Sequence, residues 1–325
     1  MFALLETPGW IGNYPLPAIV AGLVLLVFGA DLLVRGAVWI ALVIGMSRMA
    51  VGLTLVAMGT SMPELMVSLT AANSGHSAIA MANVIGSNTA NVLLIVGCAA
   101  AIRAIHLKVR KLELAYMLVA TALAGVPFLV AGGVSRGLSG AMVGMLVVFC
   151  WQLLRRERTQ VEHPGHDHPK SSLKGWLLHV LALGSGLAML AYGADWLVGG
   201  AVTVASSLGM SEAVIGMTIV AIGTSLPELA TSAVAARKGQ PEIAIGNVVG
   251  SNIFNVGAVL GIAGLLEPFP VDREGLWRLM AVTALSALAL AFVLRAKAGV
   301  PRLIGILFLL AYGGFLAVEV MLSKG

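Results

Sequence analysis

The second half of this 325-residue chain repeats the first half at a constant offset through its most polar motifs. The segment GLTLVAMGTSMPEL begins at Gly52, and GMTIVAIGTSLPEL begins at Gly216, 164 positions later. The same offset relates ANVIGSNTANV to GNVVGSNIFNV and, upstream, GADLLVRGA to GADWLVGGA. Polar residues match as well as apolar ones, so this is not the chance likeness of two hydrophobic stretches. We therefore expect two copies of one structural unit.

Apolar stretches long enough to cross a bilayer recur along the whole chain. The sequence is 59% hydrophobic and only 11% charged, whereas about 25% charged residues is typical of soluble domains. A spanning helix needs roughly 20 apolar residues. About ten stretches qualify, near residues 16–44, 51–72, 78–101, 113–133, 137–154, 174–207, 212–236, 241–266, 275–295 and 301–323. We predict an all-α integral membrane protein with about ten transmembrane helices.

Each repeat then holds about five spans, and an odd number means that two copies joined in series lie upside down relative to each other. The loops agree with this inversion. After the second span the first repeat reads AANSGHSA, with no Lys or Arg, whereas its counterpart AARKGQPE carries Arg237 and Lys238. Because cytoplasmic loops are enriched in Lys and Arg, the two loops belong on opposite sides of the membrane.

The remaining loop charges orient the chain. With the N-terminus outside, fifteen Lys and Arg residues fall in cytoplasmic loops and four outside, and Arg35 lies within a span. We therefore expect both termini to be extracytoplasmic. The predicted organisation is a first five-helix repeat over 1–155, a cytoplasmic linker over 156–173, and a second, inverted five-helix repeat over 174–325.

Several other features have ordinary interpretations. The net charge of +5 reflects loop charge and not nucleic-acid binding. Three histidines lie in the linker, at His163, His166 and His168, and we interpret it as a solvated connection because nothing fixes a metal geometry. The two cysteines, Cys98 and Cys150, fall in apolar spans as buried hydrophobes. The N-terminus lacks a basic region and a cleavage site, so we expect the first span to be retained.

Two glutamates lie within the predicted spans at matching positions of the repeats, Glu64 and Glu228. An ionisable side chain at the bilayer centre costs at least about 2.5–3.5 kcal/mol. No Lys or Arg lies in either motif to neutralise the charge. Intramembrane carboxylates usually mark ion pathways, so an ion site is a better interpretation than a packing role.

Residues around each glutamate provide further oxygen atoms. Pro63 has no N–H and Gly59 weakens the same turn, so we expect a broken helix that exposes carbonyls at mid-membrane. Exposed carbonyls are tolerated there only where they line a cavity or hold an ion. The hydroxyl residues near one helix face are Thr60, Ser61 and Ser68 in the first repeat and Thr224, Ser225 and Ser232 in the second.

The next span of each repeat adds a GSN-x-x-N motif. Ser87 and Asn91 are four residues apart, as are Ser251 and Asn255, so each pair shares a helix face. For the remaining amides we favour interhelical hydrogen bonding over ion binding; they are Asn83, Asn88, Asn247 and Asn252.

Folding two inverted units together brings both glutamate motifs to the midplane on a pseudo-two-fold axis. The donors there are carboxylate, hydroxyl, amide and carbonyl oxygens, a set that selects hard cations such as Ca²⁺ or Na⁺. Two carboxylates balance one divalent ion, or two monovalent ions or protons. This equivalence is a physical basis for antiport.

These motifs, GTS-[ML]-PE and GSN-x-x-N, resemble those of the calcium/cation antiporter superfamily, close to prokaryotic sodium/calcium exchangers and the YrbG-like members. The resemblance covers nearly the whole chain. It implies ten helices in two inverted five-helix halves and exchange of Ca²⁺ for Na⁺ across the membrane by alternating access, with the first and sixth helices sliding. The implied calcium ligands are Glu64, Glu228 and the carbonyls of Thr60 and Thr224. The implied sodium ligands are Ser61, Ser225, Ser87, Ser251 and the carbonyls of Ala57 and Ala221, with Asn91 and Asn255 at the centre.

The identity of the coupling ion depends on finer details. Potassium-dependent relatives carry Asp at the position of Asn255, and the GNxxEH-like motif typical of proton-coupled relatives is absent, so sodium is favoured over potassium and protons. The different-class alternative is an intramembrane enzyme with two carboxylates as an acid/base pair, which does not explain the inverted repeat. We expect Ca²⁺ and Na⁺ as transported substrates, no cofactor, no nucleic acid, a monomer and a cell inner membrane location.

One further acidic pair matches across the repeat. Asp31 has a partner one helical turn away in Arg35, whereas the equivalent neighbour of Asp195 is Gly199. We favour a packing role for this pair over a place in the ion pathway.

Overall fold

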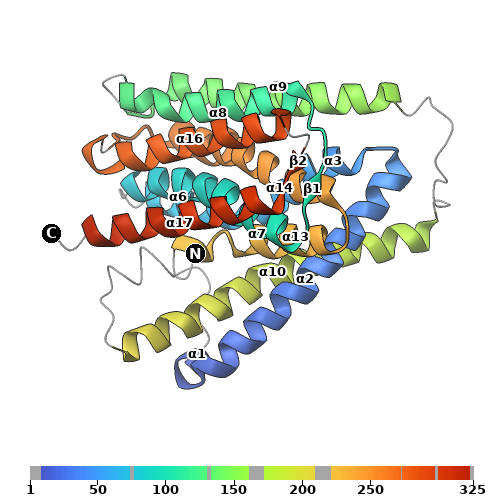
Figure 1. The fold of residues 1–325 in the computed structure, drawn as a ribbon, viewed down its shortest axis with the longest axis horizontal. Coiled ribbons are helices and arrows are strands. Elements are labelled where there is room, and N and C mark those ends of the chain that lie inside the picture. The colour runs from blue at the N-terminus through green and yellow to red at the C-terminus, as the bar shows by residue number, and fades with distance from the viewer. Residues whose placement is uncertain are drawn as a thin grey trace.

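The computed structural model describes residues 9–73, 77–129, 133–160, 172–208, 221–271, 273–296 and 299–322. Nearly all of them are helical (Figure 1). The elements of the first half are α1 (Gly9–Asn13), α2 (Pro15–Ile44), α3 (Arg48–Val51), η1 (Gly52–Val56), α4 (Ala57–Thr60), α5 (Met62–Asn73), α6 (Ser77–Ala90), η2 (Asn91–Val96), α7 (Gly97–Ile102), β1 (Ile105–His106), α8 (Lys111–Leu129) and α9 (Arg136–Gln160). Those of the second half are α10 (Leu173–Ser207), α12 (Ala221–Gly223), α13 (Leu226–Arg237), α14 (Pro241–Phe254), η4 (Asn255–Leu260), α15 (Gly261–Leu266), α16 (Arg273–Ala296), β2 (Gly299–Val300) and α17 (Arg302–Leu322).

Eight helices of the described chain are long and apolar enough to cross a membrane. A ninth span consists of Arg48–Thr60 and Met62–Ala72, which meet at a bend of 44°. This confirms the broken helix predicted beside Glu64. In the second half the corresponding span, predicted over 212–236, lies partly outside the described residues. The multi-pass helical fold is therefore confirmed, while the count of ten remains a prediction.

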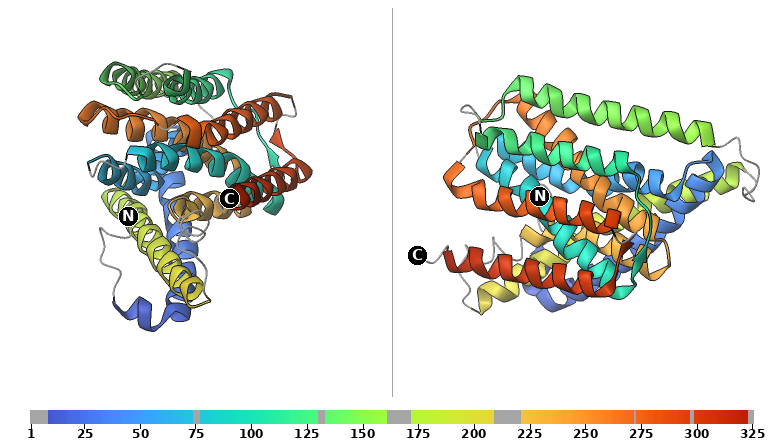
Figure 2. Two further views of the ribbon diagram at one scale, coloured as in Figure 1. Left: turned by 90° about the vertical axis from the view of Figure 1, so that its left-hand side faces the viewer. Right: turned by 45° about the horizontal axis from the view of Figure 1, so that its top comes forward.

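Helices α2 and α10 occupy equivalent places in the two repeats and cross each other as a slanted pair beside the remaining bundle (Figures 1 and 2). They run in opposite directions. A Cβ added to Gly22 would lie 2.6 Å from the backbone nitrogen of Leu197, and one added to Gly36 would lie 2.9 Å from the carbonyl of His179. Contacts that advance along α2 thus move backwards along α10, as expected of inverted copies.

Pairings at the two ends of the bundle fit the same symmetry. Strands β1 and β2 are antiparallel, with Ile105 opposite Val300. An isolated antiparallel bridge joins Val134 to Phe269, and Phe269 lies 164 positions after Ile105. In each half, the loop at Ile105 or Phe269 therefore pairs with the segment just before the last helix of the other half.

The last helix of the first half extends beyond residue 155, while the linker over 156–173 remains a prediction. Helix α9 continues to Gln160, so the first five residues of the predicted 156–173 linker are helical. The reason is that Glu157 is buried: it accepts a hydrogen bond from the backbone N–H of Ser47 at 2.7 Å and pairs with Arg110 at 3.5 Å. The three linker histidines lie outside the described residues.

Two composite helices form the centre of the molecule. Spans Ile79–Ile102 and Pro241–Leu266 are 72% and 83% buried, compared with 17–44% for the other six. Each contains a π-helical segment, η2 or η4, that begins at Asn91 or Asn255. Such segments often occur at functional sites. The most shielded part of the fold therefore coincides with the GSN-x-x-N motifs.

Candidate ion-binding site

The two predicted glutamates lie at equivalent breaks in the helices. Glu64 is in the first turn of α5 and Glu228 is in the first turn of α13, and each is 1% exposed. The N-terminal end of a helix carries a partial positive charge, which stabilises a carboxylate placed there. Each break thus provides a position for a buried negative charge.

Each glutamate accepts a hydrogen bond from the opposite repeat. The hydroxyl of Ser61 donates to Oε1 of Glu228 at 3.1 Å, and the hydroxyl of Ser225 donates to Oε1 of Glu64 at 3.5 Å. These two contacts are related by the offset of the repeat. The sequence-predicted residues of both halves therefore meet in one site.

Two asparagines hold the glutamate segments in place. The amide of Asn83 donates to the carbonyl of Glu64 at 3.2 Å and to the hydroxyl of Ser68 at 3.0 Å. The amide of Asn247 repeats this arrangement in the second half, with the carbonyl of Glu228 at 3.4 Å. Hydrogen bonding between helices, predicted for these amides, is confirmed.

The central asparagines are oriented across the repeat boundary. The amide nitrogen of Asn91 donates to the side-chain oxygen of Asn252 at 2.9 Å, and that of Asn255 donates to the side-chain oxygen of Asn88 at 3.0 Å. The Oδ1 atoms of Asn91 and Asn255 have no hydrogen-bond partner in the described chain. The roles of Asn88 and Asn252 as interhelical partners match the prediction.

The site contains buried oxygens that have no hydrogen-bond partner in the described chain. Buried polar atoms are nearly always satisfied, so each exception requires an explanation. Six of these oxygens form three pairs related by the repeat: Oε2 of Glu64 and Glu228, Oδ1 of Asn91 and Asn255, and Oγ of Ser87 and Ser251. Ser87 lies close to the Glu64 carboxylate and Ser251 close to that of Glu228. Cations bound among these oxygens would give them partners.

The threonines break the symmetry of the site. Thr60 is buried and donates to the side-chain oxygen of Asn247 at 3.1 Å. Thr224 is also buried, but its hydroxyl has no partner in the described chain. The carbonyl of Ala57 accepts from the backbone N–H of Ser61 at 3.0 Å and lies 3.4 Å from the Thr60 hydroxyl. Ala221 begins α12, and its side chain lies outside the description.

The acidic pair on α2 and α10 lies apart from these contacts. Asp31 pairs with Arg35 at 2.6 Å, as the spacing predicts, and also with Lys238, a contact that the sequence did not reveal. Asp195 is 1% exposed, and neither of its carboxylate oxygens has a partner in the described chain.

The donors of the site are oxygen atoms, which suit a hard cation. Among the described residues, no group of three or more His, Cys, Asp or Glu side chains is placed to hold a metal ion. The groups available to bind a cation at this site are two carboxylates and the neutral oxygens around them.

Comparison of the sequence with known protein families gives a match over most of the chain. The profile described as "Sodium/calcium exchanger protein" matches residues 15–155 and 178–321, which is most of the chain.

The chain belongs to the sodium/calcium exchanger family.

The exchanger is 34% identical over 316 residues to the "Inner membrane protein YrbG" of Escherichia coli, covering 94% of this chain and 95% of the relative. It is 31% identical over 338 residues to the "Sodium/calcium exchanger MaX1" of Methanosarcina acetivorans, covering 91% and 96%. Among solved structures, the sodium-calcium exchanger NCX_Mj, soaked with zero Na⁺ and Ca²⁺, superimposes with a TM-score of 0.81 at 30% identity, covering 93% of this chain and 98% of that one. The exchanger is thus a multi-pass membrane antiporter, and the intramembrane-enzyme alternative is set aside.

Proposed function

We propose that the exchanger moves Ca²⁺ in exchange for Na⁺, with Glu64 and Glu228 as the shared binding carboxylates. The observation that carries this proposal is the set of unpartnered buried oxygens, contributed in pairs by the two repeats. Two carboxylates balance the charge of one Ca²⁺. The same carboxylates balance two Na⁺ ions, so either load makes the site neutral and able to move through a low-dielectric region.

The donor chemistry supports calcium as one of the two loads. Ca²⁺ takes 6–8 oxygen ligands, often including carboxylates and carbonyls. Beside the two glutamates, the carbonyls of Thr60 and Thr224 complete the proposed calcium set. We assign to sodium the oxygens of Ser61, Ser225, Ser87 and Ser251 and the carbonyls of Ala57 and Ala221, with Asn91 and Asn255 between the two halves.

We further propose that α2 and α10 move together as the gate. Their glycines bring the two backbones into direct contact: a Cβ on Gly29 would lie 2.9 Å from the carbonyl of Gly186, and one on Gly193 would lie 2.9 Å from that of Gly22. Such a closely packed pair moves as one unit more readily than it separates. Sliding of this pair past the central helices would open the site to one side and then to the other.

Basic residues at the helix ends indicate which end of the bundle faces the cytoplasm. The last turn of α9, the start of α17 and the ends of α13 and α16 carry Arg or Lys and lie at the same end of the bundle, on the right in Figure 1. We propose that this end is cytoplasmic, which leaves both termini outside the cytoplasm. We propose a monomer as the functional unit, since one chain supplies both half-sites.

The coupling ion is tested by uptake of calcium-45 into proteoliposomes. With Na⁺ inside and Ca²⁺ outside, we expect uptake driven by the outward sodium gradient and unchanged when K⁺ is removed. The reason is that Asn91 and Asn255 are neutral amides, which bind Na⁺ through oxygen but cannot take up a proton. Asn255→Asp, which adds an acid at the centre, should make uptake more sensitive to pH.

A proton-coupled cycle is the alternative, since the two glutamates could carry protons in place of sodium. Uptake driven by a pH gradient in sodium-free medium, with no response to sodium, would replace the sodium assignment with a proton/calcium antiporter. Uptake that requires K⁺ together with Na⁺ would likewise replace it with a potassium-dependent exchanger.

A further inference from the structure

A short joint, residues 45–47, connects the gate helix α2 to the broken span that carries Glu64. Gly45 follows α2 with a left-handed φ of 71°. Ser47 is extended and begins α3, where its hydroxyl accepts a hydrogen bond from the N–H of Ala50 at 3.1 Å. Hinge motions are absorbed by a few residues in loops or at the ends of elements. Sliding of α2, as in the proposed function, therefore has to be absorbed in this joint.

A carboxylate from a distant helix holds one side of the joint. Glu157 on α9 accepts a hydrogen bond from the backbone N–H of Ser47 at 2.7 Å, although the two residues are 110 positions apart. The same carboxylate is 3% exposed and pairs with Arg110 at 3.5 Å. Such partners offset the cost of burying its charge, and a hydrogen bond to a charged acceptor is about twice as strong as a neutral one. The contact therefore fixes Ser47 and leaves the change of conformation to Gly45 and Met46.

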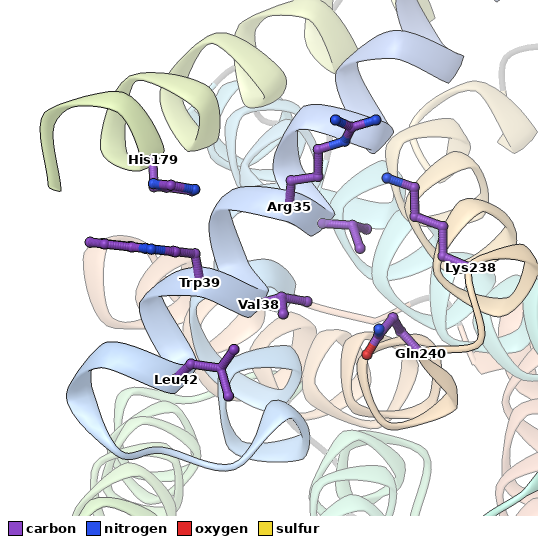
Figure 3. A pocket seen from close by; sticks show the side chains of 8 residues that line it. Arg35, Val38, Trp39, Leu42, His179, Lys238 and Gln240 are labelled. Atoms are coloured by element: carbon purple, nitrogen blue, oxygen red, sulfur yellow. The ribbon is translucent and has the colours of Figure 1, made fainter. Parts of the chain in front are cut away.

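The end of α9 is the attachment point of both gate helices. The chain runs from the end of α9 to the start of α10, while Glu157, close to the same end of α9, holds the joint that follows α2. The two gate helices also contact each other here. The rings of Trp39 on α2 and His179 on α10 stack with centroids 4.2 Å apart and planes 5° apart (Figure 3). A displacement of the joint would therefore affect both helices of the gate.

The second repeat has no acidic residue at the position equivalent to Glu157. Its joint has the same sequence, since GMS at 45–47 recurs at 209–211, which lie outside the described residues. The residue 164 positions after Glu157, however, is Met321. Its side chain is 72% exposed and carries no strong hydrogen-bond acceptor. The contact from Glu157 is therefore a departure from the two-fold symmetry that the ion site follows.

We propose that Glu157 is a positioning residue of the transport cycle, an inference that rests on the proposed motion of α2 and α10. By holding Ser47, it keeps the start of the broken span in place while α2 slides, so the joint bends at Gly45 and Met46. Without this contact, part of each movement of α2 is lost in displacement of the joint and does not open the site, so turnover falls. The oxygens around Glu64 keep their positions in the resting molecule, so calcium affinity does not change.

The test separates the hydrogen bond of Glu157 from its charge. Glu157→Asp keeps the charge but is one methylene shorter, so its carboxylate withdraws from the N–H of Ser47. Glu157→Gln loses the charge but keeps an oxygen that accepts from this N–H. In sodium-driven uptake of calcium-45 into proteoliposomes, Glu157→Asp should lower the maximal rate by about tenfold, the usual order of loss for a hydrogen bond to a charged group. Equilibrium binding of calcium-45 to the purified variant should stay unchanged, and Glu157→Gln should recover most of the rate.

Two further variants and a second readout check the cause of this loss. Glu157→Met reproduces the residue of the second repeat and should lower the rate as Glu157→Asp does. Arg155→Gln, at an exposed position of the same helical turn, should change neither rate nor calcium binding. Hydrogen exchange of the purified protein reports the contact without transport. Deuterium uptake by the peptide that contains Ser47 should rise in the Asp and Met variants and not in the Gln variant.

Three results would overturn the proposal. The first is a wild-type rate in both Glu157→Asp and Glu157→Met. The second is an equal loss of rate and of calcium binding, which would indicate support of the fold and not of the motion. The third is a loss in Glu157→Gln with a normal rate in Glu157→Asp, which would assign the effect to the charge. If protons and not sodium drive uptake by the wild type, the same comparison is made with a pH gradient, so failure of the proposed coupling ion leaves this test intact.

Discussion

Glu64→Gln and Glu228→Gln should each abolish calcium uptake by the exchanger. Each change removes half of the negative charge from a site that is buried on both sides, where Glu64 and Glu228 are 1% exposed. Removing one partner of a buried ionic contact typically costs 3–5 kcal/mol, which corresponds to at least about 100-fold weaker binding. The measurement is calcium-45 uptake at equal amounts of reconstituted protein.

A matched control distinguishes loss of the site from loss of any buried acid. Glu113 on α8 is 2% exposed, has one carboxylate oxygen without a partner in the described chain, and lies outside the proposed site. Glu113→Gln should retain uptake. Normal flux in either site variant, or equal loss in the Glu113 variant, would contradict the assignment of the two carboxylates.

Gly250→Ala should both destabilise the exchanger and stop transport. A Cβ at this position would lie 2.6 Å from Cβ of Ala57 and 2.7 Å from the carbonyl oxygen of Leu53. Both atoms belong to the broken span that leads to Glu64, so they cannot yield without moving the site. Overpacking of this kind costs about 1–3 kcal/mol. The measurements are thermal unfolding of the purified protein and calcium-45 uptake.

The control for this change is Gly144→Ala on α9. Gly144 is exposed, and a Cβ added there would meet nothing within 4 Å. This variant should keep both thermal stability and uptake, and it should even help the helix because Ala is the better helix former. If Gly250→Ala unfolds and transports like the wild type, the close contact between α14 and the broken span is not part of the working structure.

Much of the architecture could be predicted because the internal repeat and the residues within it restrict how the chain can fold. The offset of 164 between Glu64 and Glu228 predicted a two-fold arrangement, and Pro63 predicted the broken helix that the structure places at the same point. These are local signals, readable from residue type and spacing alone.

Contacts between the halves were harder to predict, because they depend on how the copies dock. The hydrogen bond from Ser61 to Glu228 joins residues 167 positions apart, and neither motif indicates which residue its side chains contact. The same holds for Lys238 and Asp31, where only the nearby Arg35 was visible from helical spacing. The burial of Glu157, in the part of α9 that continues beyond residue 155, is likewise a tertiary effect that residue type and spacing do not reveal.

The central claim is that one calcium ion binds between the two repeats, and a crystal structure of the exchanger soaked with Ca²⁺ tests it most directly. The account predicts an anomalous-scattering peak on the pseudo-two-fold axis, with both Glu64 Oε2 and Glu228 Oε2 at the usual calcium–oxygen distance of about 2.3–2.6 Å. The same crystals soaked with Na⁺ alone should lose this peak. A calcium ion held by only one of the two glutamates, or bound elsewhere while their oxygens stay unpartnered, would contradict the account.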